Sequence, residues 1–154
     1  MAKLISLTQG KHTAVDNADF DWLSQWRWHF YKRYVARRDK TQNYKYIYMH
    51  RLLMNAPPGK EVDHINNDPL DNRKRNLRLC SRAQNLQNAR RRSDNKSGFK
   101  GVHWDDKRSK WLAQIVNNGK YVFIGRFEDK NSAAREYNNA ARRYFGEFAK
   151  ENCI

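Results

Sequence analysis

Four polar side chains between residues 63 and 85 have the types and the spacing needed for metal-assisted cleavage of a phosphodiester. Asp63 is followed directly by His64, and Asn76 and Asn85 come 12 and 21 residues after that histidine. A carboxylate and an amide oxygen can hold a hard divalent cation, and an imidazole can take a proton from water near neutral pH. Asp63 and Asn85 are therefore candidate metal ligands, His64 is the candidate general base, and Asn76 would hold the loop or ring that aims His64.

Each of these residues also has a purely structural interpretation. An isolated Asp-His pair is more often a turn with a hydrogen-bonded imidazole than a catalytic site. Asn76 could satisfy the backbone of a turn, and Asn85 could be a solvated residue of a helix. The four residues together, within one short stretch of expected topology, favour catalysis.

A strand, a turn, a second strand and a helix are expected to carry these side chains. Turn-forming residues fill the segment between the two short strands, and Ser81 with Gln84 matches a capping box at the start of the helix. Asp63 and His64 would then lie at the end of the first strand, and Asn85 would lie one turn into the helix and face them. The expected elements are a strand at Glu61–His64, a turn at 66–72, a strand at Leu77–Cys80 and a helix to about Arg92.

The chain is basic along its whole length, which indicates a polyanion as its partner. Its 154 residues carry a formal net charge of +15 and have a sequence pI of about 10.1. Residues 1–60 contribute +7, residues 61–96 contribute +4 and residues 97–154 contribute +4. A long surface of this kind gains affinity from each phosphate that it neutralises. Double-stranded DNA is the expected partner, and a basic but functionally neutral surface is the alternative.

Cysteine content and hydropathy favour a soluble cytoplasmic protein. Cys80 and Cys153 provide neither a disulfide framework nor a zinc quartet, so free thiols in a reducing compartment are expected. The apolar run at the N-terminus is too short for a signal peptide, and no apolar stretch approaches the ~20 residues of a membrane span. We expect a monomer that uses neither a membrane nor a small-molecule cofactor.

Residues 1–48 are expected to form short strands, either as a further DNA contact or only as a scaffold. Bulky and polar residues alternate with a period near two in 26–31, 34–37 and 44–48, as in a half-buried sheet. A short helix, Met49–Met54, should follow; in it His50 would support the site or simply pack, and Arg51 would clamp a phosphate or be solvated. One polar face of the sheet would carry Arg27, Lys32, Arg33, Arg37, Arg38 and Lys45.

A second unit is expected after a basic linker. The run 90–98 lacks apolar residues, which is typical of a linker, and its Arg90 and Arg91 are candidate DNA contacts. Three strands are expected at 99–104, 111–116 and 121–127, with a hairpin turn at 117–120. A helix that ends at Gly146 would pack on them. Its apolar face would be formed by Ala134, Tyr137, Ala141 and Tyr144.

The segment from about His50 to Arg92 resembles an HNH nuclease motif with a ββα-metal fold. It is especially similar to the variant of phage and intron homing endonucleases whose last motif residue is asparagine. The resemblance implies that Asp63 and Asn85, or Asn88 one turn further on, hold Mg²⁺ or Mn²⁺, that His64 is the base, and that Asn76 is the middle asparagine. It also implies cleavage of one or both DNA strands in a bacterial or phage-infected cell.

Residues 98–152 resemble an AP2/ERF-type DNA-binding domain, through the stretches Phe99-Lys-Gly-Val, Trp111-Leu-Ala-Gln-Ile, Ile124-Gly-Arg-Phe and 133–146. Such domains lay a three-stranded sheet in the major groove, where all four base pairs can be distinguished. At least one of the two tryptophans Trp104 and Trp111 is expected to pack on the sheet. The resemblance places on the binding strands Lys100, His103, Gln114, Tyr121, Phe123 and Arg126. Lys100, Lys110 and Arg126 would mainly hold phosphates.

We therefore expect an α+β protein made of a small N-terminal antiparallel sheet, a central ββα-metal unit and a C-terminal three-stranded sheet with one helix. The expected boundaries are 1–48, 49–92, a linker at 93–98 and 99–152. The expected function is metal-dependent DNA cleavage of the homing type. A DNA-binding regulator with a degenerate nuclease unit and a nuclease or binder of structured RNA are the alternatives, and the closed major groove of RNA argues against the last.

Overall fold

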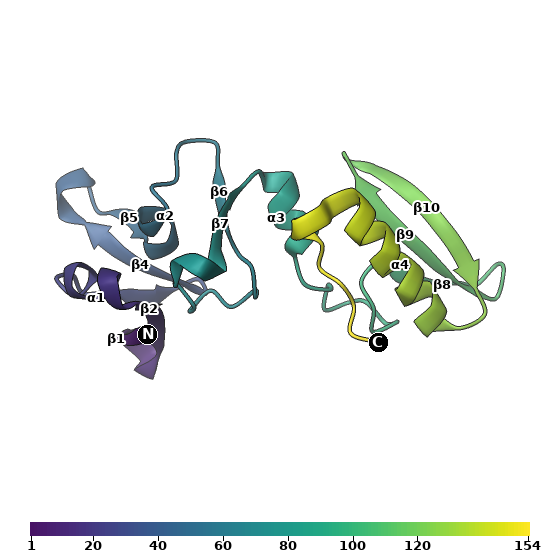
Figure 1. Cartoon of the computed structure of the whole chain (residues 1–154), viewed down its shortest axis with the longest axis horizontal. Helices are drawn as coiled ribbons and strands as arrows, with labels where there is room; N and C mark the ends of the chain where they lie inside the picture. The colour runs from purple at the N-terminus through teal and green to yellow at the C-terminus, as the bar shows by residue number, and fades with distance from the viewer. The chain divides into compact units, whose positions relative to one another are not determined.

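The computed structural model describes residues 1–154, except for the side chain of Gln42. It is a mixed α+β structure with several small antiparallel sheets and few helices, as the sequence predicted at that level. The chain forms two compact units, Met1–Asn85 and Leu86–Ile154, which are described separately (Figure 1). No helix of the described structure is both long enough and apolar enough to cross a membrane.

The first unit contains three small antiparallel sheets and short helices. Its first hairpin pairs β1 with β2, its three-stranded sheet has the order β3-β4-β5, and its last hairpin pairs β6 with β7. The helix α3 begins in this unit and ends in the next. The elements are β1 (Ala2–Ser6), β2 (His12–Asp16), α1 (Asn17–Leu23), β3 (His29–Tyr31), β4 (Tyr34–Asp39), β5 (Lys45–Tyr48), α2 (Met49–Leu53), β6 (Glu61–His64), β7 (Leu77–Cys80) and α3 (Arg82–Asn88).

One hydrophobic core holds the first unit together. The segment 1–53 supplies most of it, and the last hairpin adds Val62 and Leu77. Trp28 is 1% exposed, and its indole N–H donates to the backbone oxygen of Leu23 at 2.9 Å, so it belongs to this core and not to the strand predicted from Trp26. The other buried members are Ile5, Val15, Leu23, Val35, Met49 and Leu53. The N-terminal 48 residues and the last hairpin therefore fold as one body.

The predicted single basic face of the N-terminal sheet is wrong. Arg37 and Arg38 are neighbours in β4, and neighbouring residues of a strand point to opposite faces. The Arg37 guanidinium lies 4.7 Å from the centre of the Trp26 ring, on the core side. Arg38 instead donates two hydrogen bonds to the Tyr46 hydroxyl on the other face. The positive charge of this sheet is therefore divided between its two faces.

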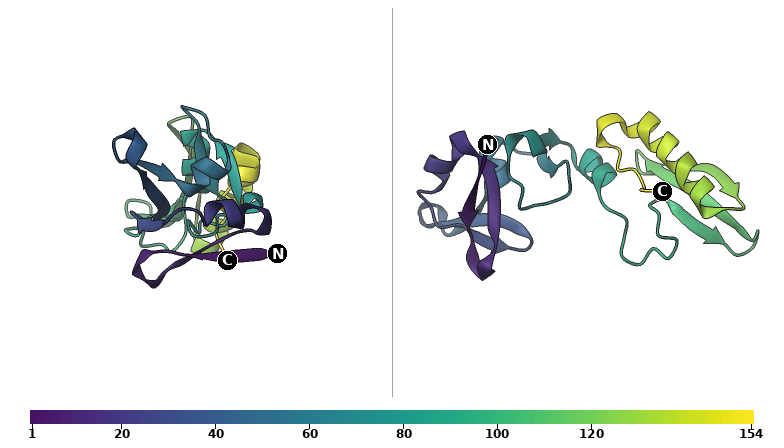
Figure 2. Two further views of the ribbon diagram at one scale, coloured as in Figure 1. Left: turned by 90° about the vertical axis from the view of Figure 1, so that its left-hand side faces the viewer. Right: turned by 60° about the horizontal axis from the view of Figure 1, so that its bottom comes forward.

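The second unit is a three-stranded antiparallel sheet of order β10-β9-β8 with the helix α4 on one face (Figures 1 and 2). Its strands are β8 (Val102–Asp105), β9 (Lys110–Asn117) and β10 (Lys120–Phe127), and α4 is Lys130–Phe145. The predicted hairpin turn is confirmed, with positive φ at Asn118 and Gly119. Gly146 ends α4 with a φ of 53°, as predicted.

Two details of this unit differ from the sequence prediction. The helix face that packs on the sheet contains Ala134, Tyr137 and Ala141 but continues to Phe145, 8% exposed, and not to Tyr144, 42% exposed. The first strand begins at Val102, because Gly101 has a φ of 73° and interrupts the extended run. A Cβ at Gly101 would lie 2.1 Å from the Tyr137 ring, so only glycine fits the approach of β8 to α4.

The basic run 90–98 is partly ordered by its own hydrogen bonds. Ser97 is 6% exposed, and its hydroxyl lies 2.8 Å from the backbone oxygen of Val102 and 2.8 Å from Oδ1 of Asn95. The helix α3 ends at Asn88, earlier than the predicted Arg92. Lys100 explains this end, because its ammonium donates to the carbonyl oxygens of Gln87 and Ala89 at 2.6 and 2.7 Å and so satisfies helix-end acceptors.

Candidate active site

The hairpin β6-β7 positions the two residues with the strongest catalytic chemistry. Its antiparallel register places Asp63 opposite Arg78 and His64 opposite Leu77. Because side chains alternate along a strand, Asp63 shares a face with Glu61, and His64 shares the opposite face with Val62. Val62 and Leu77 belong to the core of the first unit, so the His64 face is packed and fixed. The predicted strand pair is confirmed at both strands.

Asp63 is buried and paired with a guanidinium. It is 5% exposed, and its Oδ2 accepts hydrogen bonds from Nε and Nη2 of Arg78 at 2.9 and 2.8 Å. Cys80 lies on the same face of the hairpin. Burial raises the pKa of the Cys80 thiol to about 11, and the negative charges of Asp63 and Glu61 act in the same direction. The thiol is therefore uncharged; it lines the site and is not a reactive group.

The helix α3 brings Asn85 to the same side of the hairpin as Asp63. The predicted capping box is present: the Ser81 backbone N–H donates to Oε1 of Gln84 at 2.8 Å, and the Gln84 N–H donates to the Ser81 hydroxyl at 3.2 Å. Nδ2 of Asn85 donates to Oε2 of Glu61 at 2.7 Å. Since a carboxylate only accepts, this bond turns the Asn85 amide oxygen away from Glu61. Glu61 and Asn85 are thus in contact, on the strand face that also carries Asp63.

His64 is buried on the other face of β6 and is held by polar and aromatic neighbours. It is 6% exposed, and its Nε2 lies 3.4 Å from Oδ1 of Asn72. Burial lowers the pKa of His64, while the bond to Asn72 and the charge of Asp63 oppose part of that shift. The ring centres of His50 and Tyr34 lie 5.2 and 6.2 Å away. The imidazole is therefore neutral at physiological pH, as a general base must be.

His50 packs directly against His64. It is 8% exposed, and burial lowers its pKa to about 3, with the charges of His64 and Arg51 acting in the same direction. Its Nδ1 makes no hydrogen bond among the side chains that the structure describes. Of the two alternatives for His50, the structure shows packing, against His64. The Arg51 guanidinium is neither simply solvated nor left open for a phosphate. It donates to the backbone oxygens of Lys60, Ala56 and Pro57.

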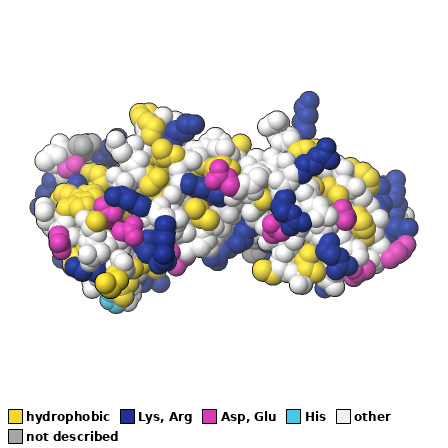
Figure 3. All heavy atoms as spheres, in the orientation of Figure 1, with side chains coloured by type: hydrophobic (Ala, Val, Ile, Leu, Met, Phe, Trp, Pro, Cys, Tyr) yellow, Lys and Arg dark blue, Asp and Glu magenta, His cyan; other side chains and the backbone are white. Residues whose placement is uncertain are grey.

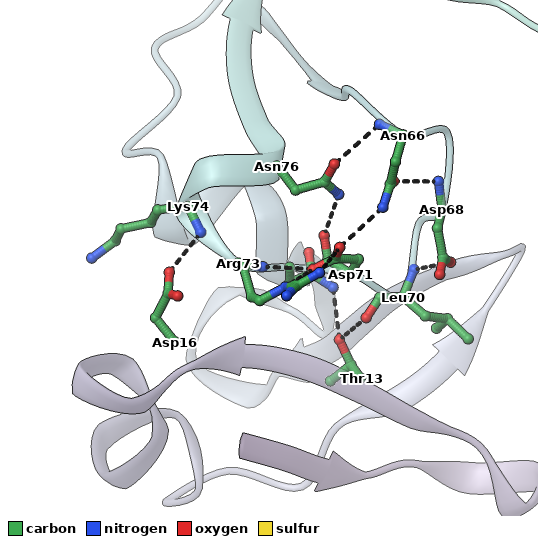
Figure 4. Close-up of polar contacts among 10 residues, drawn as sticks. Thr13, Asp16, Asn66, Asp68, Leu70, Asp71, Arg73, Lys74 and Asn76 are labelled. Atoms are coloured by element: carbon green, nitrogen blue, oxygen red, sulfur yellow. Dashed lines mark hydrogen bonds and ion pairs between the residues drawn. The ribbon is translucent and has the colours of Figure 1, made fainter. Parts of the chain in front are cut away.

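Asn76 ties together the loop between the two strands (Figure 4). Its Oδ1 accepts from the backbone N–H of Asn66 at 3.0 Å, and its Nδ2 donates to the backbone oxygen of Asp71 at 2.8 Å. Asp71 in turn accepts two hydrogen bonds from Arg73 at 2.6 and 2.5 Å. Asn76 is 7% exposed and does not bond to the His64 ring among the contacts described, so it acts on the loop.

The oxygen donors of the Asp63 face suit a hard divalent cation. In the described part of the chain, no three His, Cys, Asp or Glu side chains form a potential metal centre. A site with one carboxylate and one amide does not need three such residues, because Mg²⁺ takes few protein oxygens and keeps several waters. These oxygen donors, beside a Cys80 thiol that stays protonated, also favour magnesium or manganese over softer metals. Asp63 and Asn85 fit the proposed ion by their chemistry.

The candidate DNA contacts of the second unit share one face, with one exception. Strand alternation and register place them on the face opposite to α4, where Tyr121 is 74% and Phe123 is 57% exposed. The Arg126 guanidinium lies 4.9 Å from the Phe123 ring centre and pairs with Asp105 at 2.8 Å. Lys100 is the exception, since its ammonium caps α3. The residues on this open face are His103, Lys110, Gln114, Tyr121, Phe123 and Arg126.

The remaining basic candidates are exposed, and they are scattered. Lys32 and Arg33 form the two-residue turn between β3 and β4, both with positive φ. Arg91 donates to the backbone oxygen of Asn95 at 2.9 Å, and Arg27 and Arg90 also face solvent. In each unit, the lysine and arginine side chains on the face drawn in Figure 3 are spread and not gathered in one patch. Trp104 and Trp111 pack edge to face with ring centres 5.1 Å apart, as predicted for at least one of them.

Three residues of the site were missed by sequence reasoning. Arg78 could have been found, because pairing the two predicted strands end to end places it opposite Asp63. Glu61 could also have been found, because it lies two residues before Asp63 and strand alternation places both on the same face. For Asn72 the sequence carried no signal beyond its place in a turn, because its partner Thr13 is 59 residues away in the sequence.

Comparisons with known proteins give the class. A family model described as HNH endonuclease matches residues 55–87, which contain β6, β7 and most of α3. The chain is also 33% identical over 135 residues to the uncharacterised HNH endonuclease L560 of Acanthamoeba polyphaga mimivirus, covering 86% of this chain and 70% of that protein.

A second relative is protein 3.8 of Escherichia phage T7, which is 33% identical over 89 residues, covering 54% of this chain and 74% of that protein. No solved structure matches significantly. The chain belongs to the HNH endonuclease family. Membership indicates a nuclease that acts on DNA, and nucleases of this family generally depend on a divalent metal.

Proposed function

We propose that this protein is a metal-dependent DNA endonuclease of the homing type, in which the hairpin β6-β7 and the helix α3 form the cutting unit. The observation that carries the proposal is that β6 ends in a buried carboxylate, Asp63, followed directly by a buried neutral imidazole, His64, while α3 places Asn85 beside Glu61 on the Asp63 face. The homing type follows the sequence resemblance, and the phage relative supports an origin in a phage or a bacterial host. The protein would act as a monomer.

The proposed roles follow from the chemistry of each side chain. His64 takes the proton from the attacking water, because it is neutral, held by Asn72 and of a type that ionises near neutrality. Asp63 and Asn85 would hold Mg²⁺ or Mn²⁺ through oxygen atoms, with Asn88 as the alternative second ligand. When bound, the cation would stabilise charge on the scissile phosphate and the leaving oxygen. Asn76 keeps the loop before β7 in one conformation.

Cleavage of supercoiled plasmid tests the catalytic proposal. Wild-type protein with Mg²⁺ or Mn²⁺ should convert the plasmid to open circles or linear molecules, and which product appears distinguishes cleavage of one strand from cleavage of both. Chelation with EDTA should stop the reaction. His64→Ala should slow it by about 10²- to 10⁴-fold, whereas His12→Ala, a change at an exposed histidine of β2, should not.

Two results would contradict the assignment. His64→Ala protein that cuts at the wild-type rate would exclude His64 as the base. Wild-type protein that binds plasmid but leaves it intact with either ion would favour the non-catalytic regulator. A structured RNA incubated in parallel should remain uncut.

We further infer that the open face of the β8-β9-β10 sheet is the DNA anchor, as in the AP2-type domains that its sequence resembles. Two exposed aromatic side chains beside Arg126, which stacks on Phe123, support this reading, since single-module DNA contacts combine guanidinium and apolar groups on one element. Replacing both Tyr121 and Phe123 with alanine should weaken binding to duplex DNA at least tenfold, measured by fluorescence anisotropy. Tyr144→Ala, an exposed aromatic of α4, is the matched control. Equal affinity in the double variant would exclude this face.

A further inference from the structure

A chain of buried hydrogen bonds runs from the strand β2 to the ring of His64. The Thr13 hydroxyl donates to the backbone oxygen of Leu70 at 2.7 Å. Nδ2 of Asn72 donates to the Thr13 hydroxyl oxygen at 2.8 Å and to the backbone oxygen of Pro69 at 3.3 Å. Oδ1 of Asn72 then lies 3.4 Å from Nε2 of His64. Thr13 and Asn72 are both fully buried, at 0% exposure.

The direction of every bond in this chain is fixed by chemistry. A backbone carbonyl can only accept, so the single hydroxyl proton of Thr13 goes to Leu70 and its oxygen is left as an acceptor. The amide nitrogen of Asn72 must therefore face Thr13 and Pro69. Rotating that amide by 180° would set its oxygen against two acceptors and lose both bonds, at a cost that a buried site does not tolerate. The amide orientation, which is ordinarily an assignment, is determined here by its neighbours.

The same logic continues into the imidazole. Because Oδ1 of Asn72 can only accept, Nε2 of His64 carries the proton, and the lone pair of the neutral ring is on Nδ1. We propose that Thr13 and Asn72 are positioning residues which fix the tautomer and the orientation of His64 and thereby make Nδ1 the atom that accepts the proton from water. The catalytic consequence rests on the proposed function, whereas the tautomer itself does not.

The backbone around this relay is held independently of the side chains. Ala14 N–H donates to the Leu70 oxygen at 2.9 Å, and the Asn72 N–H donates to the Ala14 oxygen at 2.8 Å. The loop before β7 is thus bridged to β2 in parallel, between Ala14 and Asp71. A change at the Thr13 side chain therefore removes one link of the relay while these two backbone bonds still dock the loop. This makes Thr13→Val a clean perturbation.

The first test reads the tautomer without DNA or metal. Protein labelled with ¹⁵N at histidine is examined by long-range ¹H–¹⁵N correlation at pH 8, in the full chain. Wild-type His64 should show a protonated nitrogen at Nε2 and an unprotonated one at Nδ1. Thr13→Val and Asn72→Leu should both populate the Nδ1–H form. Thr41→Val, at an exposed threonine of the same unit, should leave the signals unchanged.

The second test reads catalysis. Partners that orient a metal-bound imidazole contribute about 10- to 100-fold to activity. We expect a similar effect at His64, so Asn72→Leu should lower kcat for plasmid cleavage by about that factor while KM stays within about twofold. Thr13→Val should show a smaller fall of the same kind. If Asn72→Leu does not fold, Thr13→Val alone decides, because its backbone docking is retained.

The outcomes separate the relay from the proposed function. A wild-type His64 protonated on Nδ1, or a Thr13→Val protein with unchanged tautomer and unchanged kcat, would overturn the relay. Protein with the expected Nε2–H signal that depends on Thr13 but with no cleavage of DNA would uphold the relay and contradict the role of His64 as the base.

Discussion

Arg78 provides a direct way to ask whether Asp63 is the metal ligand, without measuring cleavage. Its guanidinium bonds to Oδ2 of Asp63 through two nitrogens at 2.9 and 2.8 Å, and the two side chains are 12% and 5% exposed. Replacing Arg78 with methionine keeps the length of the side chain and removes the charge. Breaking one partner of a buried ion pair typically costs about 3–5 kcal/mol, because the remaining charge is left uncompensated. We expect a loss of stability of that size in metal-free Arg78→Met.

Divalent cation should return part of this loss. A cation that binds at Asp63 replaces the missing guanidinium, and it no longer meets a like charge that at an effective dielectric of ~20 would oppose a divalent ion by about 8 kcal/mol at 4 Å. We therefore expect the variant to bind Mg²⁺ at least about tenfold more tightly than wild type. Each tenfold gain adds about 1.4 kcal/mol to the stabilisation by saturating Mg²⁺.

Urea unfolding of the full chain measures this effect. Replacing Trp104 and Trp111 with phenylalanine leaves Trp22, Trp26 and Trp28 as fluorophores, so emission reports the first unit alone. The control is Arg73→Met, which breaks a similar pair with Asp71 at 2.5 Å in the same unit but frees a carboxylate that is not a proposed ligand. Equal stabilisation by Mg²⁺ in wild type, Arg78→Met and Arg73→Met would refute Asp63 as the ligand.

Three further predictions concern stability. The pKa of His50 is about 3 in the folded protein against 6.5 unfolded, so the unfolded state binds the proton first as pH falls. The free energy of unfolding of the first unit should therefore fall by about 2 kcal/mol between pH 6.5 and 5. In the urea assay, the fall should be smaller in His50→Phe. The pKa of Lys100 is about 8 in the folded protein against an ordinary value of 10.5, so the folded state gives up its proton first as pH rises. The free energy of unfolding of the second unit should therefore rise by about 2 kcal/mol between pH 7.5 and 9.5. Slower exchange of its amides, after correction for the intrinsic rate, would show this rise, and Lys100→Met should abolish it. Gly101→Ala should destabilise that unit by more than Gly119→Ala in thermal unfolding, because both have positive φ but only Gly101 would clash, with Tyr137; equal losses would contradict this.

The elements with local signals were predicted from the sequence. The strands Glu61–His64 and Leu77–Cys80 and the capping box at Ser81 each depend on a few neighbouring residues, and all three are present as predicted. The turn at Asn118 and Gly119 is another such case. These features follow from residue type and spacing alone, because turn and cap preferences act within four residues.

The features that depend on distant partners were not predicted. The periodicity of residues 34–48 correctly indicated strands. Arg37 and Arg38 were given to one face although strand alternation separates neighbours, and only the contact of Arg37 with Trp26 had no local signal. Lys100 was assigned to DNA, whereas its ammonium binds the carbonyl oxygens of Gln87 and Ala89 at the end of α3. Thr13 carried no signal at all, since its role depends on a contact across 59 residues. Long-range packing decided each of these outcomes.

The nuclease motif is therefore part of a fold that it does not hold together by itself. The family model matches residues 55–87, yet only Val62 and Leu77 of the nine buried core residues of the first unit lie in that range. The other seven precede it, as does Thr13, through which β2 fixes the loop that carries Asn72. Because a hairpin and a short helix cannot bury enough apolar surface alone, residues 1–53 serve the base of the proposed reaction in two ways: their core holds β6 in place, and their β2 strand determines which nitrogen of His64 carries the proton.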